Sequence, residues 1–318
     1  PSMKVYRNQD QFPPFRNAVI TIGTFDGVHE GHRKIISHMQ EEAQKIDGET
    51  VIITFHPHPR KVVSSAILGI RLINTLDEKI QLLEHAGIDH LVIVPFTQEF
   101  ANQSAEEYIA NFLVANFRPH TIIIGYDHRF GRDRLGDYRL LEKMSAVYQY
   151  SLREIPKHVL AEIAISSTNI REAIVHGDIE TANQLLGYEF FFEGVVVDGD
   201  KLGRKLGYPT ANLRVTDEEK ITPGNGIYAV SVGLQPGELF QPAFKGMMSI
   251  GLRPTVNGKS RVIEVNIFDF DSDLYGQTIR VYVKKYLRPE LRFETLEDLV
   301  VQIGKDKEQT LQIFSSAK

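Results

Sequence analysis

The sequence contains no cysteine among its 318 residues, and this absence limits the chemistry available to the protein. Disulfide bonds and thiolate metal sites are excluded, so any metal ion must be held by oxygen or imidazole ligands. Oxygen ligands suit Mg2+ in particular. Without the cysteine framework of a secreted domain, the cytoplasm is the expected location.

Two other absences exclude further classes of protein. No apolar run approaches the roughly 18 residues that a membrane-spanning helix needs, and no signal-type segment stands near the N-terminus. Basic residues are not in excess, because 36 Lys and Arg stand against 41 Asp and Glu, for a net charge of -5. We therefore expect neither membrane nor nucleic-acid binding, and local groups must hold any anionic ligand.

The length and composition fit a globular protein of two domains. Domains usually contain about 100 to 200 residues, so 318 residues accommodate two. Hydrophobic residues make up 42% and charged residues 24% of the chain, which is ordinary for a packed protein. Repeats and low-complexity tracts are missing, so the order of helical and strand patterns must locate the domain boundary.

The first half alternates short β-rich apolar runs with longer helical patterns, which is typical of βαβ units around a parallel sheet. We expect strands at residues 19–24, 51–55, 91–94 and 121–125 and helices at residues 31–45, 76–85 and 105–117. Ligands of such open sheets bind beyond the carboxyl ends of the strands. The loops that follow these strands are therefore where chemistry is expected.

After Gly187 the pattern changes to short strands separated by Gly, Pro and Asp-rich turns, which indicates a small antiparallel barrel or sandwich. Strands are expected at residues 190–197, 226–232, 244–250, 261–270 and 278–286, followed by a helix at 295–314. Residues 165–186 between the halves predict two short helices, the first capped by Ser167 or Thr168 and the second by Asp178. The predicted domains are residues 1–187 and 188–318.

Directly after the first expected strand, the run GTFDGVHEGH at residues 23–32 leads into a helix. Glycines let the backbone approach a polyphosphate, and the amides and dipole of a helix start favour negative charge. His29 and His32 can donate hydrogen bonds to phosphate oxygens as negative charge develops on them. Phosphoryl and nucleotidyl transfers are catalysed mainly by positioning and by stabilisation of this charge, so they need no protein nucleophile. The competing interpretation is that one histidine caps the helix and the other is an ordinary surface residue.

The His-x-Gly-His run resembles the signature of the nucleotidylyltransferase superfamily, and the longer Gly-x-Phe-Asp-Gly-x-His form resembles the bacterial FAD synthetase module. This resemblance implies that ATP phosphates are bound by Gly23, Phe25, Asp26, Gly27 and Gly31. It also implies flavin-binding loops after the second and fourth strands, at His56, Pro57, His58, Asp127 and Phe130. His128 stands where the family usually has Phe, and a purely structural turn is the alternative for the His/Pro-rich loop.

The run Ile165-Ser166-Ser167-Thr168-Asn169-Ile170-Arg171 matches the Ile-Ser-Ser-Thr-x-x-Arg phosphate motif of the same family. The planar guanidinium of Arg binds phosphate through paired N–H donors and stays charged at all ordinary pH values. Arg171 is therefore the candidate that stabilises the negative charge on the leaving pyrophosphate. The resemblance adds Ser166, Ser167 and Thr168 to the phosphate-binding residues. An ordinary helix cap followed by a surface Arg is the alternative.

In the second half, a glycine-punctuated basic loop precedes the run Pro209-Thr210-Ala211-Asn212. Alternation along a strand puts Thr210 and Asn212 on one face, where two oxygen-bearing side chains can help to hold a hard cation. A β-turn before an exposed strand is the competing interpretation. The Pro-Thr-Ala-Asn run resembles the hallmark of riboflavin kinases, which implies ATP binding by Gly203, Arg204, Lys205, Gly207 and Pro209.

Glu264 is a single carboxylate in an otherwise apolar expected strand. A hydroxyl that attacks ATP needs its proton removed, and one carboxylate within hydrogen-bond reach is the usual provision. A lone strand Glu that faces solvent is the alternative, but the position is similar to that of the kinase family's catalytic base. The resemblance extends to Arg288 and Glu290, which it implies as flavin-binding residues.

The two resemblances together span about residues 19–313, in the order of the bifunctional bacterial riboflavin kinase/FAD synthetases. They imply ATP-dependent phosphorylation of riboflavin to FMN with release of ADP, followed by adenylylation of FMN to FAD with release of pyrophosphate, both with Mg2+. The chain is expected to be a monomer or a weak homo-oligomer. Three alternatives remain: one inactive site, a non-catalytic flavin-binding protein, and an adenylyltransferase for another substrate.

Overall fold

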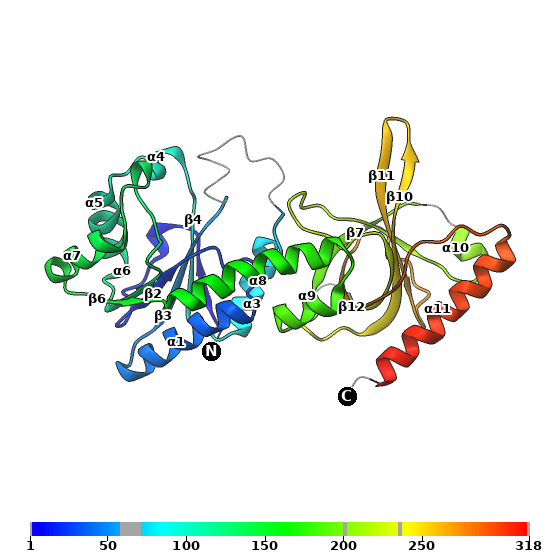
Figure 1. The fold of residues 1–318 in the computed structure, drawn as a ribbon, viewed down its shortest axis with the longest axis horizontal. Helices are drawn as coiled ribbons and strands as arrows, with labels where there is room; N and C mark the ends of the chain where they lie inside the picture. Colours follow the sequence, from blue (N-terminus) through cyan, green and yellow to red (C-terminus); the bar gives the residue numbers. More distant parts are fainter. Residues whose placement is uncertain (1, 58–70, 200–201, 235–236, 317–318) are drawn as a thin grey trace. The chain divides into compact units, whose positions relative to one another are not determined.

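The computed structural model describes residues 2–57, 71–199, 202–234 and 237–316. These residues form two compact units (Figure 1). The first contains described residues of 1–70 and 74–167, and the second contains residues 71–73 and those of 168–318. In the described part of the chain, none of the helices combines the length and apolar character that crossing a bilayer requires.

The described residues of the first unit form a six-stranded parallel sheet in the order β1-β4-β3-β2-β5-β6. Its strands are β1 (Lys4–Tyr6), β2 (Val19–Ile22), β3 (Thr50–Phe55), β4 (His90–Val94), β5 (Thr121–Ile124) and β6 (Ser151–Glu154). The four inner strands are fully or largely buried and apolar, as a sheet covered on both faces requires. The predicted parallel sheet is confirmed, while the two edge strands were not expected from the sequence.

Helices cover this sheet and supply its cores. They are α1 (Glu30–Lys45), α3 (Leu76–His85), α4 (Gln98–Ala101), α5 (Ala105–Glu107), α6 (Ala115–Phe117) and α7 (Tyr138–Tyr148), with a π-helix, η2 (Tyr108–Val114), and 3-10 turns η1 (Gln9–Gln11) and η3 (Arg132–Arg134). Helix α1 packs on β2 and β3. Aromatic residues of η2 and α6 pack on alternate residues of the strands, so the expected helix at 105–117 exists but contains a π-helical stretch.

Helix α8 (Lys157–Val175) corrects one prediction, because it runs without a break through the segment expected to begin a helix at Ser167 or Thr168. Val159, Ile170 and Ile174 are buried along it. Burial of these apolar residues outweighs the preference of Ser and Thr for helix ends. The second expected helix is correct: α9 (Ile179–Leu186) is capped by Asp178, whose carboxylate accepts from the Thr181 amide.

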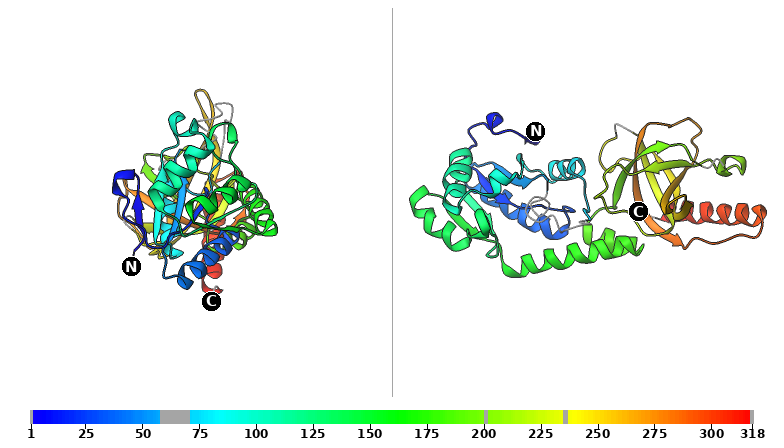
Figure 2. Two further views of the ribbon diagram at one scale, coloured as in Figure 1. Left: turned by 90° about the vertical axis from the view of Figure 1, so that its left-hand side faces the viewer. Right: turned by 90° about the horizontal axis from the view of Figure 1, so that it is seen from above.

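The described part of the second unit contains a closed antiparallel barrel in the order β10-β11-β8-β7-β12-β9. Its elements are β7 (Phe191–Val197), α10 (Leu202–Lys205), β8 (Ala211–Arg214), β9 (Gly226–Leu234), β10 (Phe244–Thr255), β11 (Gly258–Ile267), β12 (Thr278–Arg288) and α11 (Leu296–Ser316). Figure 2 shows the barrel and the C-terminal helix α11 from a second direction. Within the described barrel each strand pairs with two neighbours, and the predicted barrel with a C-terminal helix is confirmed.

Two details of the barrel differ from the sequence prediction. Strand β10 continues to Thr255, beyond the expected residues 244–250, and β11 spans Gly258–Ile267 instead of the expected 261–270. The two strands form a long hairpin, which projects from the barrel in Figure 1. The basic loop before Thr210 contains the four-residue helix α10. Gly207, with φ +86°, ends this helical turn in the left-handed conformation that glycine adopts most readily.

Candidate active sites

The loop between β2 and α1 holds an unusual backbone at the carboxyl end of the sheet. Phe25, Gly27 and Val28 have φ angles of +51°, +93° and +39°. Glycine adopts such angles readily, whereas a β-branched residue such as Val28 rarely does. Val28 is also buried, with 1% exposure, so the surrounding packing holds this conformation in place. Backbone strain of this kind is concentrated at ligand-binding sites.

The two histidines of the motif lie against each other at the start of α1. His29 is the N-cap, and its Nδ1 accepts from the Gly31 amide at 3.1 Å. With Nδ1 accepting, the neutral ring carries its proton on Nε2, which lies 2.9 Å from Ser167 Oγ and donates to it. His32 Nδ1 accepts from the His29 amide at 3.2 Å, and the two rings stack with centroids 3.9 Å apart. The capping interpretation is therefore correct for His29, whose side chain is fully buried.

Gly31 is required by the close approach of two helices. A Cβ atom at this position would lie 2.9 Å from Ile163 Cγ1 on α8 and 3.0 Å from Cε1 of His29. Contacts this short force the neighbouring atoms to move. Gly31 therefore lets α8 bring Ser167 to His29, which the sequence alone placed 138 residues away.

Hydrogen bonds of Asp26, within the loop, and of Lys79, on α3, hold the same loop in place. Asp26 Oδ1 accepts from the Asn74 amide at 3.1 Å. Lys79 Nζ donates to Thr24 O at 2.9 Å and to Thr54 Oγ1 at 3.2 Å, so it joins the ends of β2 and β3. Burial lowers the pKa of Lys79 to about 8, and the Asp26 carboxylate opposes the shift. Sequence reasoning missed Lys79, because one Lys in an amphipathic helix carries no signal.

The expected flavin loops also follow the sheet's carboxyl ends. His56 and Pro57 come directly after β3, and the His56 amide donates to Val94 O, whereas His58 lies outside the described residues. Asp127 is exposed after β5, and Phe130 is buried with its ring stacked on Tyr108 at 4.8 Å.

His128 occupies the family's Phe position as a neutral aromatic ring. It stacks on Phe130 with centroids 5.7 Å apart and planes 27° from parallel. Its Nε2 has no hydrogen-bond partner among the described residues. Burial lowers the pKa of His128 to about 4, with Asp127 opposing and Arg134 reinforcing the shift. At neutral pH the imidazole therefore packs as an uncharged ring, as Phe would.

The predicted phosphate motif lies along helix α8 and is divided between the two units. Ser166 and Ser167 are the last residues of the first unit, and Thr168 and Arg171 belong to the second. Arg171 Nε donates to Arg71 O at 2.9 Å within that unit. The structure therefore joins Ser167 to His29, and it places Arg171 one helical turn further along α8.

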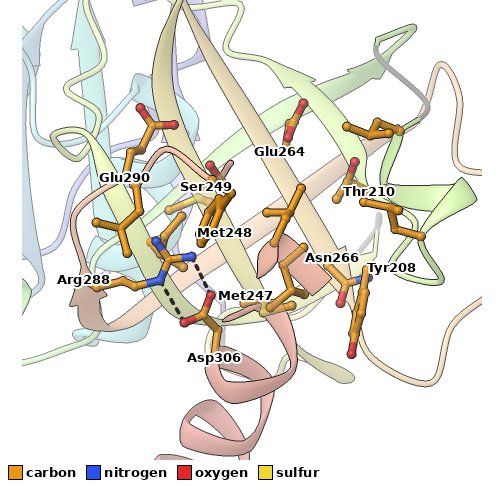
Figure 3. A pocket seen from close by; sticks show the side chains of 18 of the residues that line it. Tyr208, Thr210, Met247, Met248, Ser249, Glu264, Asn266, Arg288, Glu290 and Asp306 are labelled. Carbon is orange, nitrogen blue, oxygen red and sulfur yellow. Dashed lines mark hydrogen bonds and ion pairs between the residues drawn. The ribbon is translucent and has the colours of Figure 1, made fainter. Parts of the chain in front are cut away.

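The barrel of the second unit contains a cavity of about 370 Å3 that includes several predicted kinase residues. Thr210, Glu264, Arg288, Glu290 and Gly203 line it. Figure 3 shows Arg288 and Asp306 at one end, Thr210 and Asn266 at the other, and Glu264 between them. Met247, Met248, Ile303 and Phe293 supply apolar surface. A mixed cavity of this size suits a small organic ligand.

Glu264 faces the strand that carries Asn212. The two residues are direct partners in the register between β11 and β8, so their side chains lie on the same face of the sheet. Thr210 and Asn212 together line an adjoining cavity of about 600 Å3, which confirms that they face one space. Asn266 Nδ2 donates to Pro209 O at 2.6 Å and fixes the start of this segment. Glu264 therefore lines the cavity while its side chain stays partly exposed.

The other predicted ATP residues are only partly brought together. Arg204 and Pro209 line the 600 Å3 cavity with Asn212, and Gly203 lines the 370 Å3 cavity. Lys205 and Gly207, both within the described chain, line neither cavity. No group of three or more His, Asp or Glu side chains in the described ranges could hold a metal ion. A cation here would depend on the oxygens of Thr210 and Asn212, with phosphates and water, which fits Mg2+.

Arg288 and Glu290 lie at the cavity but bind protein groups. Arg288 forms a two-point ion pair with Asp306, and Glu290 pairs with Arg253 at 3.2 Å. A Cβ atom at Gly251 would fall 2.1 Å from a Glu290 oxygen, so glycine leaves room for this carboxylate. Sequence reasoning missed Asp306, because nothing in a helical Asp shows which distant strand it contacts.

Comparisons with known proteins match both halves of the chain. The family model for FAD synthetase matches residues 12–169, and that for riboflavin kinase matches residues 186–314. The bifunctional riboflavin kinase/FMN adenylyltransferase of Haemophilus influenzae is 36% identical over 301 residues, which cover 95% of this chain and 96% of that protein. Its Escherichia coli (strain K12) counterpart is 37% identical over 305 residues, 96% of this chain and 95% of that protein.

A solved structure covers the whole fold. A Streptococcus pneumoniae protein described as a macrolide-efflux protein superposes with a TM-score of 0.81 at 31% identity, over 98% of this chain and 99% of that chain. The two family matches cover the residues of the motifs described above except Arg171, and the curated relatives match this chain over nearly their full length. The chain therefore belongs to the family of bifunctional riboflavin kinase/FMN adenylyltransferases.

Proposed function

We propose that this chain catalyses two successive ATP-dependent reactions. The second domain transfers the γ-phosphoryl group of ATP to a riboflavin hydroxyl, which yields FMN and ADP. The first domain joins the FMN phosphate to the adenylyl group of a second ATP, which yields FAD and pyrophosphate. The observation that carries the proposal is Glu264, which lines the barrel cavity and pairs in register with Asn212, in a chain that also holds the His29/His32 motif at the sheet end.

In the kinase reaction Glu264 takes the proton from the attacking hydroxyl. Thr210 and Asn212 would hold Mg2+ through their side-chain oxygens, and the ion would supply positive charge for the phosphates. Gly203, Arg204, Lys205, Gly207 and Pro209 form the ATP-binding segment. Arg288 and Glu290 belong to the flavin end of the cavity.

In the adenylyltransferase reaction the loop at residues 23–32 binds the ATP phosphates through backbone amides at the start of α1. His32 and His29 stabilise the charge that develops, and for His29 this requires exchange of its Ser167 contact for a phosphate oxygen. Arg171 stabilises the leaving pyrophosphate. His56, Pro57, His58, Asp127 and Phe130 form the flavin loops.

The domain limits, location and assembly stay predictions. We place the functional boundary between residues 187 and 188, near the start of the riboflavin kinase match at residue 186. A cytoplasmic location, and a monomer or weak homo-oligomer, are the expectations. The small-molecule partners are riboflavin, FMN, FAD, ATP, ADP and pyrophosphate, with no nucleic acid or membrane.

The test is incubation with riboflavin, ATP and Mg2+, with chromatographic separation of the three flavins over time. FMN should rise first and FAD after it. Glu264→Gln should slow FMN formation by about 100-fold or more but convert supplied FMN to FAD. His32→Ala should show the reverse pattern. A non-catalytic flavin-binding protein would consume no ATP, and equal loss of both steps in either folded variant would contradict separate sites.

A further inference from the structure

The C-terminal helix α11 forms one wall of the 370 Å3 barrel cavity. Leu299, Ile303 and Asp306 line the cavity, and their spacing of four and three residues places them on one face of the helix. Leu296, Val301 and Leu311 are exposed. The helix therefore presents a narrow face to the cavity.

The buried residues of this helix are polar. Among its described residues, Asp306 and Thr310 are the buried ones, with exposures of 2% and 0%. Thr310 Oγ1 donates to Asp306 O at 2.8 Å. The apolar residues on the same face, Leu299, Ile303 and Ile313, are only half-buried, so the placement of α11 depends in part on what the buried Asp306 binds.

Asp306 binds Arg288, the last residue of β12. Arg288 Nε donates to Oδ1 at 2.9 Å, and Nη2 donates to Oδ2 at 2.8 Å, which is the two-point geometry of a guanidinium with a carboxylate (Figure 3). Gln302 Nε2 adds a third bond to Oδ1 at 3.0 Å. The side chains of Arg288 and Asp306 are only 16% and 3% exposed, so solvent screens the pair weakly.

An irregularity at the end of β12 directs the Arg288 side chain towards α11. Strand β12 shifts register against β9 between Tyr286 and Arg288, and such irregularities redirect side chains. Arg288 then pairs with Ile227, which lines the same cavity. Its remaining nitrogen, Nη1, donates to Pro289 O at 3.0 Å. Each nitrogen of Arg288 thus donates a hydrogen bond within the protein.

We propose that Asp306 is a positioning residue of the kinase site, which acts through Arg288 to hold α11 as the wall against which riboflavin binds. This inference rests on the proposed function and revises one part of it: Arg288 supports flavin binding through Asp306 rather than by its own hydrogen bonds to the flavin. Glu264, Thr210 and Asn212 lie on or beside other strands, so the phosphate end of the site does not depend on this pair.

The experiment measures kcat and KM of FMN formation for Asp306→Asn in the full-length chain. This change keeps the shape of the side chain but leaves the Arg288 charge buried without a counter-ion, which is strongly unfavourable. We expect KM for riboflavin to rise by about tenfold or more, while KM for ATP and the conversion of supplied FMN to FAD stay within about twofold. Asp298→Asn, an exposed Asp on the same helix, is the matched control and should match the original chain.

A second pair of variants separates positioning from direct flavin contact. Arg288→Met should raise KM for riboflavin as Asp306→Asn does, and the double variant should be no worse than the worse single variant, because both act through one interaction. Additive effects would assign Arg288 a direct flavin contact and overturn the proposal. Asp306→Glu, which keeps the charge, should recover most of the affinity.

The remaining outcomes are distinguishable. An unchanged KM for riboflavin in Asp306→Asn would overturn the positioning role. If Asp306→Asn does not fold, Gln302→Leu, which removes one hydrogen bond to Asp306 and leaves the ion pair, should raise KM for riboflavin by a few fold, and no change there would overturn the role as well. Failure of the original chain to form FMN at all would instead contradict the proposed kinase activity.

Discussion

Gly199, two residues beyond β7, controls the position of the proposed metal ligand Asn212. A Cβ atom at Gly199 would lie 2.1 Å from Asn212 Cγ, 2.2 Å from Nδ2 and 2.4 Å from Oδ1. Gly199 does not have a positive φ, so its backbone accepts an L-residue without strain. The substitution Gly199→Ala should therefore act on the Asn212 carboxamide rather than on the backbone.

The size of the effect follows from these distances. Ordinary contacts between such atoms begin at about 3.4 Å, so the carboxamide must move by more than about 1 Å. Mg2+ requires ligand oxygens at about 2.0 to 2.1 Å in near-octahedral geometry, and a misplacement of about 1 Å costs roughly 100-fold in rate. We expect Gly199→Ala to lower kcat/KM for FMN formation by about 100-fold and to raise the Mg2+ concentration needed for half-maximal rate.

The assay follows FMN formation and FMN-to-FAD conversion separately at a series of Mg2+ concentrations. FMN-to-FAD conversion should stay within about twofold, because Gly199 lies in the other unit. Gly233→Ala is the matched control: this glycine lies in β9 of the same barrel, and no atom of the residues that the structure describes lies within 4 Å of the added Cβ position.

A double variant tests the route of the effect. If Gly199→Ala acts through Asn212, then Gly199→Ala combined with Asn212→Ala should be no slower than Asn212→Ala alone. The reasoning would be refuted if Gly199→Ala kept FMN formation and its Mg2+ dependence unchanged, or if its effect simply added to that of Asn212→Ala.

Three other predictions concern the first unit and the metal. Gly31→Ala should slow FAD formation from FMN by about tenfold or more, because the added Cβ would press on His29 and Ile163. The kinase reaction should be unchanged. Equal rates of FAD formation in the variant and the original chain would contradict the helix contact. For His128, the folded-state pKa of about 4 lies below the ordinary 6.5, so stability is lost as pH falls from about 6.5 to about 4, by up to about 2 kcal/mol at pH 5. His128→Phe should remove this loss, and unfolding midpoints at pH 7 and pH 5 check it. Removal of divalent cations with a chelator should stop both reactions and Mg2+ should restore them, so either reaction continuing without metal would argue against the proposed metal role.

Much of the fold and of both sites could be predicted because the signals are local. The alternation of apolar runs with helical patterns predicted the parallel sheet, and the Gly and His residues at 23–32 marked the loop after its first inner strand. The Pro209–Asn212 run and Glu264 were singled out by their resemblance to riboflavin kinases, because residue type and spacing alone left a structural alternative open, and the β8/β11 register brings Asn212 and Glu264 together.

Other features could not be predicted, because contacts between distant segments decide them. Ser167 looked like a helix cap, but burial of Val159, Ile170 and Ile174 makes α8 continuous, and Gly31 then lets Ser167 meet His29. The aromatic stack that accepts a neutral His128 likewise exists only once Phe130 and Tyr108 are packed.

The sequence by itself determined which chemical groups the two sites contain, since turn residues, strand alternation and motif spacing act over a few residues. The tertiary structure decided which other residues position those groups. Asp306 forms an ion pair with Arg288, Gly199 leaves room for the Asn212 side chain, and Lys79 links the ends of β2 and β3. The physical reason is that close packing and weakly screened ion pairs depend on atoms far apart in the chain reaching the same few ångströms of space.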